Sequence, residues 1–361
     1  MRLRRARTIF AYWKGKELVF ANYRTRVSVT AHPFTAQILD FFDRWRQPED
    51  LVCDIPQYSA SSLRAAIGQL AKNTLLVRAG TFDARQDAEL AKSWTTWLPY
   101  GGFHFGTKDV RFARGNQREK LAESHLTRSS QPPFFKTYRN ARRLRLPRCQ
   151  IPDTEFARVL KSRKTHRQFS DTALPLAVVS QLLFCTWGVM GYLPTLYGQA
   201  PHKSSPSGGA RHPGEVYLLA LKIRGLSPGL YYYDPKNHSL VVLRDGHMEK
   251  KAVEYCAGQA HVKNAAALFL MTAVFPRSMW RYRFARAYRV VLLDAGHLCQ
   301  TFCLTATWLG LAPFCTAALK DSLIERDLGI DGISESVLYV AGVGAPRAVR
   351  KSPSAALDVY S

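Results

Sequence analysis

The sequence predicts an α+β protein, in which a three-layer domain of a mixed sheet flanked by helices follows a small winged-helix-like domain. From Ile151 onward, segments with helical periodicity alternate with short apolar runs, and one apolar helix extends from Arg286 to Leu309. The first 80 residues instead combine a β-hairpin pattern with two amphipathic helices. Since 361 residues are enough for two cores, we expect three segments: residues 1–80, a connecting segment at 81–150, and the larger domain at 151–361.

The first segment opens with a hairpin pattern. Apolar and polar residues alternate between residues 8 and 29 on both sides of Lys14-Gly15-Lys16. Helical periodicity then predicts one helix at 34–45 and a second at 61–73, which Ser59 or Ser61 could cap. A short strand at 75–78 completes the winged-helix-like unit.

The connecting segment shows poor periodicity, and we expect it to pack on the larger domain. Its stretch from Gln117 to Arg148 is polar and basic, with Pro132 and Pro133 in the middle, which favours a partly mobile loop.

Each element of the larger domain has its own pattern. Pro175 begins the amphipathic helix LPLAVVSQLLFCTWGV, and the long helix follows at residues 286–309. Strands are predicted for EVYLLALKI, LVVL, AAALFLMTAVF and VLYVAGVG. In GLYYYDP, one or two of the three tyrosines should face the core.

Composition is that of a globular protein, with 47% hydrophobic residues. No apolar run reaches the roughly 18 residues of a membrane span. The basic start is not followed by the apolar region of a secretory signal, so we expect a cytoplasmic protein.

The chain is strongly basic, with 51 Lys and Arg residues against 27 Asp and Glu residues and a formal charge of +24. Such a field attracts polyanions or acidic peptides, although runs of this kind are also common on solvated faces and linkers. The excess is concentrated in two arginine clusters, namely Arg2, Arg4, Arg5 and Arg7, and then Arg139, Arg142, Arg143, Arg145 and Arg148.

The seven cysteines include no CxxC pair, and their odd number fits no closed set of disulfides, so we expect reduced thiols. Cys299 and Cys303 are four residues apart on a predicted helix, a spacing that suits a metal. No histidine or second cysteine pair in the pattern completes the ligand set, so we interpret them as small buried hydrophobes and expect no metal.

Two segments carry the chemistry. Ser162-Arg163-Lys164-Thr165-His166-Arg167-Gln168-Phe169 places a hydroxyl between alternating basic side chains, which can bind a phosphate group. Some forty residues later, the small-residue loop SSPSGGARHPGEVY runs into a strand, and its glycines allow the backbone to approach a flat ligand closely.

With the later elements GLYYYDP, YRVVLLDAGHL and LGL, these segments resemble the SagB-type (McbC-like) FMN-dependent dehydrogenases of the nitroreductase-like superfamily, in family order over about 200 residues. Members of this family oxidise thiazolines and oxazolines in ribosomally made peptides to thiazoles and oxazoles. The resemblance therefore implies a nitroreductase-like fold, an FMN cofactor and a peptide substrate.

The resemblance also implies site residues. Arg163 and Thr165 should hold the FMN phosphate, and Arg167 should reach the pyrimidine edge of the flavin. The remaining residues that the resemblance places at the cofactor are Pro206, Ser207 and Gly208 from the partner subunit's loop, Pro313, Thr316 and Ala317 in a turn facing flavin N5, and Arg347 at the phosphate.

One position departs from the family pattern. Relatives that oxidise azolines carry a Lys-Tyr pair where this chain has Arg281-Tyr282. Azoline oxidation removes a proton, and an arginine side chain stays protonated, so it cannot act as the base. We therefore expect Tyr282 to be the base, with the Arg281 guanidinium stabilising its phenolate.

Three polar residues have structural interpretations as well. His297 is expected to be a hydrogen-bonded core histidine, and Glu215 an acceptor for a loop donor. His212, inside the glycine-rich loop, is equally compatible with a structural and a functional role.

The winged-helix-like segment has two possible partners. Its helix at 61–73 offers only Arg64 and Lys72 for phosphate contacts, so nucleic acid binding is not expected. The hairpin at 9–29 instead suits the binding of a leader peptide by strand addition. A cyclodehydratase is a further possible partner.

The leading functional hypothesis is thus an FMN-dependent peptide dehydrogenase, acting as a homodimer with its flavins at the interface. The alternative is an NAD(P)H-dependent nitro or quinone reductase that uses FMN. A third possibility is a binding partner with a degenerate flavin site.

Overall fold

The computed structural model describes residues 1–98, 101–113 and 151–347, together with residues 116, 117, 119, 120, 123, 124, 133–136, 142, 144, 146 and 147. Most of the loop predicted at 117–148 and four members of the second arginine cluster, Arg139, Arg143, Arg145 and Arg148, lie outside the described residues.

The predicted hairpin is confirmed as β2 (Ile9–Lys14) and β3 (Glu17–Asn22), to which β4 (Val27–Thr30) adds a third antiparallel strand. A separate pair joins β1 (Leu3–Arg5) to the predicted strand β5 (Leu76–Arg78). The helices are α1 (Phe34–Phe41), α2 (Pro48–Asp54) and α3 (Ala60–Lys72). Ser59 caps α3 by accepting a hydrogen bond from the Ser62 backbone at 3.4 Å, whereas α2 was not predicted.

The connecting segment contains helices that the sequence pattern did not indicate, α4 (Phe82–Ser93) and α5 (Gly101–Gly106). Trp94 and Trp97 follow α4 and are fully buried in a cluster with Phe275 and Tyr288 of the larger domain. The indole nitrogen of Trp94 also donates to the carbonyl of Ile333 at 2.9 Å. The segment therefore lies on the larger domain as part of its core.

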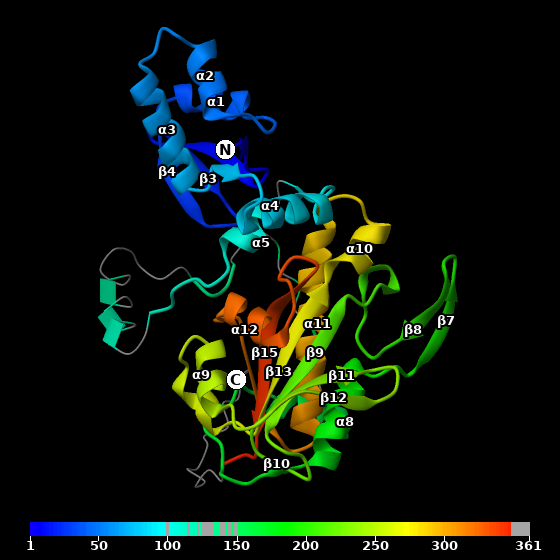
Figure 1. The fold of residues 1–361 in the computed structure, drawn as a ribbon. Helices are drawn as coiled ribbons and strands as arrows, with labels where there is room; N and C mark the ends of the chain where they lie inside the picture. The colour runs from blue at the N-terminus through cyan, green and yellow to red at the C-terminus, as the bar shows by residue number, and fades with distance from the viewer. Residues whose placement is uncertain are drawn as a thin grey trace.

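The larger domain is built around a six-stranded sheet (Figure 1), with its strands in the order β12 (Ser239–Asp245), β11 (Gly229–Asp234), β9 (Gly214–Ala220), β13 (Ala267–Val274), β15 (Glu335–Gly344) and β14 (Ala312–Thr316). Its ladders are antiparallel throughout. Among the described residues, the parallel pairing expected of a mixed sheet occurs only in the short pair β6 (Leu174–Pro175) and β10 (Ile223–Arg224).

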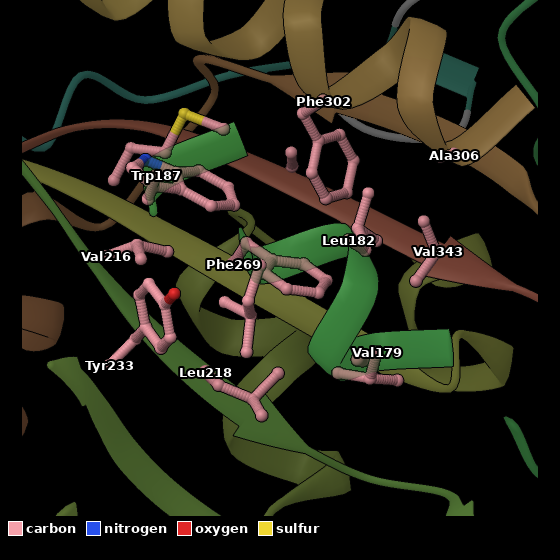
Figure 2. Close-up of a cluster of buried hydrophobic side chains, with 14 of the residues drawn as sticks. Val179, Leu182, Trp187, Val216, Leu218, Tyr233, Phe269, Phe302, Ala306 and Val343 are labelled. Atoms are coloured by element: carbon pink, nitrogen blue, oxygen red, sulfur yellow. The ribbon is translucent and has the colours of Figure 1, made fainter. Parts of the chain in front are cut away.

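Helices cover both faces of this sheet, which confirms the predicted α+β three-layer architecture. Helices α8 (Leu176–Trp187) and α11 (Ala287–Trp308) lie on one face, and α9 (Glu249–Tyr255) and α12 (Asp321–Leu328) on the other. Side chains alternate along β13, so Phe269 packs with Trp187 and Phe302 on the first face (Figure 2), while Leu270 packs on the second. In β11, Tyr231 and Tyr233 are buried as expected.

Three further elements frame the site. Helix α7 (Glu155–Ser162) precedes the basic segment, and α10 (Phe275–Arg281) leads into α11. The hairpin of β7 (Gly191–Thr195) and β8 (Gly198–His202) projects from the domain (Figure 1).

Helix α11 is long and apolar enough to cross a membrane by length and composition, yet it packs on the sheet as a core helix.

Candidate functional site

The basic segment after α7 runs along the free edge of β14. The backbone N–H of His166 donates to the carbonyl of Pro313 at 2.8 Å, and that of Ser170 donates to Ala345 at 2.9 Å. Proline is tolerated on an edge strand, where its missing N–H breaks no ladder. Phe169 also forms a bridge with Pro346, so the basic segment and Arg347 lie at the same end of the sheet.

We call Arg163, Thr165, Arg167 and Arg347 the phosphate clamp. Arg163 is half-buried, and the other three side chains are exposed. Within the described part of the chain, no carboxylate pairs with any of the three arginines. Guanidinium groups without carboxylate partners, together with a hydroxyl from the same segment, form a suitable donor set for a phosphate group.

The expectation of a turn at Pro313 to Ala317 is wrong, because residues 312–316 form the edge strand β14. Thr316 is buried, and its hydroxyl oxygen accepts hydrogen bonds from the Gln259 side chain at 2.7 Å and the Ala318 backbone at 3.1 Å. Ala317, just past the strand, is exposed. Pro313 and Thr316 therefore lie in strand β14, and only Ala317 lies in the segment that follows the strand.

A pocket of about 390 Å³ adjoins Ala317. Phe103 and Phe112 of the connecting segment line one side, and Tyr288 and Leu292 of α11 line another. This volume lies within the range of small-ligand sites, so the pocket can accept a side chain or a ring of a substrate.

A second group of predicted residues surrounds residues 206–209, which we call the glycine loop. The hydroxyl of Ser207 donates to Asp294 Oδ2 of α11 at 2.6 Å, and the backbone N–H of Gly208 reaches Oδ1 at 3.3 Å. Burial raises the pKa of the Asp294 carboxyl, while these two hydrogen bonds oppose the shift. Asp294 was not among the predicted site residues, and the available signal was that it is the single acidic residue of α11.

Arg281 and Tyr282 belong to the same group. The Arg281 guanidinium donates to the carbonyl of Gly209 at 3.1 Å and lies over the rings of Tyr197 and Tyr282, at 5.2 and 5.3 Å from their centroids. A methyl group added at Gly209 would come within 2.3 Å of the Tyr282 hydroxyl. The phenol therefore lies directly against the loop.

A polar network centred on the buried Glu215 adjoins the glycine loop through His212. Glu215 forms an ion pair with Arg277 and accepts a hydrogen bond from Tyr232 at 3.1 Å, so it is a structural acceptor, but its donors lie on α10 and β11 and not on the expected loop. Arg277 also donates to the carbonyl of His212 at 3.1 Å. Burial, with a smaller contribution from the charge of Lys203, lowers the pKa of His212 to about 4.

The prediction for His297 is wrong. Its side chain is exposed on α11, on the outward side of the helix, whereas Asp294 and Leu298 are buried. Only one side of the helix packs on the sheet. Because most residues of α11 are apolar, the sequence pattern did not show which residues lie on the side that faces solvent.

The phosphate clamp and the glycine loop lie at opposite ends of the sheet. Pro313 is paired with Val343, and Val343 with Ala267 at one end of β13, whereas the loop enters β9 at Gly214, opposite Ala273 at the other end. Six residues of strand separate these positions, which corresponds to about 20 Å. The two groups of predicted residues therefore do not meet within one chain.

The structure also corrects the interpretation of the cysteines. Cys299 and Cys303 are buried on α11 as predicted, but Cys315 of β14 joins them, and the three sulfur atoms lie within 4.8 Å of one another. Periodicity could not show this contact, because it joins a helix to a strand.

Comparisons with known proteins identify several relatives of this chain. At the sequence level, the chain is 27% identical to the trifolitoxin-processing protein TfxB of Rhizobium leguminosarum bv. trifolii, over 82% of this chain and 85% of TfxB. It is 29% identical to the nitroreductase-type protein MJ1384 of Methanocaldococcus jannaschii, over 50% of this chain and 89% of that protein. The microcin B17-processing protein McbC of Escherichia coli is 25% identical over 38% of this chain and 53% of McbC.

Solved structures give a similar result. A nitroreductase-type structure from Anabaena variabilis matches with a TM-score of 0.45 and 26% identity, over 53% of this chain and 38% of that chain. A chain of the E. coli microcin synthetase McbBCD complex matches with a TM-score of 0.47 and 18% identity, over 73% of this chain and 93% of that chain. The sequence profile of the Nitroreductase family matches residues 160–345, which is more than half of the chain. The chain belongs to the nitroreductase family.

Proposed function

We propose that the protein is an FMN-dependent dehydrogenase that tailors a ribosomally made peptide, oxidising thiazoline or oxazoline rings to thiazoles or oxazoles. One observation carries the proposal. The similarity to TfxB, whose name describes processing of trifolitoxin, extends over 82% of this chain and therefore beyond the nitroreductase domain. The similarity to MJ1384 covers only 50%. The N-terminal region is thus a feature shared with a peptide-processing protein.

The phosphate clamp would hold the phosphate of FMN. Three arginines without carboxylate partners in the described chain, with the Thr165 hydroxyl between two of them, match the charge and the acceptors of that group. When bound, FMN supplies a two-electron acceptor for the dehydrogenation.

The protein would act as a two-fold homodimer with sites shared between subunits. The glycine loop contacts α11 near Asp294, and the charge of Arg163 acts on Cys303 nine residues further along the same helix. Leu292 and Leu293, directly before Asp294 on this helix, are 38% and 54% exposed. Antiparallel packing of α11 from two copies would cover these leucines and bring the loop of one subunit to the clamp of the other.

In such a site Tyr282 would be the general base, accepting the proton from the ring carbon that is oxidised. Arg281 cannot take a proton, and its bond to the Gly209 carbonyl gives it a different role. It would fix the loop and place a positive charge over the Tyr282 ring. The pocket beside Ala317 would receive the substrate residue.

The peptide would also contact the first segment. Strand β2 is an edge strand, and its Phe10, Tyr12 and Trp13 side chains are exposed. An extended leader peptide could add to this edge through main-chain hydrogen bonds, with the aromatic side chains supplying apolar contacts. A cyclodehydratase would supply the azoline substrate.

A nitro or quinone reductase is the second candidate, since Arg281 replaces the lysine expected in azoline oxidation. The full-length protein should be purified, its FMN content measured, and the bound flavin mixed anaerobically with an azoline-containing peptide or with NADPH. The proposal predicts bleaching by the peptide and none by NADPH alone. Rapid bleaching by NADPH, with no effect of the peptide, would favour the reductase.

A further inference from the structure

Three thiols converge at one place in the larger domain. Cys299 and Cys303 lie one turn apart on α11 and are 4% and 7% exposed, and the half-buried Cys315 approaches them from β14. All three sulfur atoms lie within 4.8 Å of one another. The remaining described cysteines, Cys53, Cys185 and Cys256, are not part of this group.

The geometry favours a metal ion over a disulfide between the two helix cysteines. Residues four apart on a helix have Cβ atoms about 5 to 6 Å apart, whereas a disulfide requires about 3.5 to 4.5 Å. A tetrahedral zinc ion with Zn–S bonds of about 2.3 Å holds its sulfur ligands about 3.8 Å apart. Three sulfurs within 4.8 Å can reach that arrangement by small rotamer adjustments.

The surroundings supply what such a site needs. The hydroxyl of Tyr339 donates to the Cys315 sulfur at 3.1 Å, so an oxygen atom already lies beside the thiols. Three thiolates and one divalent cation carry a net charge of only −1.

We propose that Cys299, Cys303 and Cys315 bind one thiophilic divalent cation, Zn²⁺, with the Tyr339 oxygen or a water molecule as the fourth ligand. The ion would tie α11 to β14 immediately before Thr316 and Ala317. It would thereby fix the strand that borders the substrate pocket. The proposal does not depend on the identity of the substrate or on FMN.

Zinc content tests the proposal. The full-length protein, reduced and loaded with Zn²⁺, should retain about one ion per chain after dialysis against a weak chelator, measured by atomic emission. Cys315→Ser should retain less than about one tenth of that amount. Cys53→Ser is the matched control, because Cys53 is exposed and distant from the group, and it should retain as much as wild type.

A measurement on the unmodified chain covers the case in which the variant does not fold. Co²⁺ added to the reduced protein should give the intense visible absorption of tetrahedral cobalt–thiolate sites, at wavelengths beyond the flavin bands. Weak absorption typical of oxygen-ligated Co²⁺ would overturn the proposal. So would zinc retention in Cys315→Ser equal to that of wild type, or a disulfide joining Cys315 to a helix cysteine in the protein as purified.

Discussion

The two ends of the sheet in the larger domain are built differently. At the phosphate clamp, arginine side chains without carboxylate partners in the described chain flank an extended segment, which is held by main-chain bonds to Pro313 and Ala345 and by the buried side chain of Phe169. At the glycine loop, the Ser207 hydroxyl and the Gly208 backbone N–H are bonded to Asp294, and the Gly209 carbonyl is bonded to Arg281. The clamp is suited to receive an anion, and the loop to present a rigid surface. In the proposed homodimer, each end would supply half of a site.

The largest effect is expected at the clamp. Arg163→Ala should abolish the retention of FMN, because it removes a half-buried guanidinium that has no carboxylate partner in the described chain and is free to bind the phosphate. Flavin content after gel filtration is the measurement. Arg158→Ala, on the exposed side of α7 and paired with Asp153, is the matched control and should keep its flavin. Full occupancy in Arg163→Ala would remove this residue from the site.

A large kinetic effect is expected at the other end. Tyr282→Phe should lower the rate of flavin reduction by the peptide by about a hundred- to ten-thousandfold, the usual contribution of a general base. Its FMN content should be unchanged, since Tyr282 contacts the loop and not the clamp. Stopped-flow absorbance measures the rate, and Arg281→Lys should retain activity. A Tyr282→Phe enzyme as fast as wild type would eliminate the tyrosine as the base.

The rigidity of the loop can be tested by comparing two glycines with similar backbone angles. Gly209 and Gly310 have φ of 64° and 70°. A methyl group added at Gly209 would meet the Tyr282 hydroxyl, whereas a methyl group added at Gly310 would have no other atom within 4 Å. Gly310→Ala should cost about 1 kcal/mol of unfolding free energy from backbone strain alone. Gly209→Ala should cost about 1 to 3 kcal/mol more, from overpacking. Equal costs in urea unfolding would show that the loop can move away from Tyr282.

The smallest effect concerns pH. Burial lowers the pKa of His212 from 6.5 to about 4, so the folded state favours the neutral ring. This contribution to stability is present above the unfolded-state pKa and is lost as the pH falls through the folded-state value. His212→Asn, which tolerates the positive φ of 42° at this position, should weaken the loss of unfolding free energy between about pH 7 and about pH 4. An unchanged pH dependence would mean that His212 is accessible to solvent in the folded protein.

Local patterns in the sequence predicted much of the fold. The alternation of apolar and polar residues around Gly15 predicted the first hairpin, Ser59 was one of the two caps expected for α3, and the apolar run at 286–309 predicted α11. These features depend on neighbours within a few residues. The helix α4 was missed because its mean hydropathy is low, and its buried face consists of only a few side chains.

The contacts within the candidate site could not be predicted from local sequence patterns. The bond between Ser207 and Asp294 joins residues 87 positions apart, and the approach of Cys315 to α11 depends on how a strand packs under a helix. Periodicity along the chain carries no information on such pairs. The separation of the clamp from the glycine loop likewise follows from the strand register, which appears only in the folded sheet.

The central claim is that each active site combines the clamp of one subunit with the glycine loop and Tyr282 of the other. Co-expression of Arg163→Ala and Tyr282→Phe chains with different affinity tags, followed by isolation of the mixed dimer, tests it most directly. One of its two sites would then have both halves intact, so the mixed dimer should show about half of the wild-type activity per dimer, and a random mixture about one quarter. Activity no higher than that of the two variants purified separately would contradict the shared site.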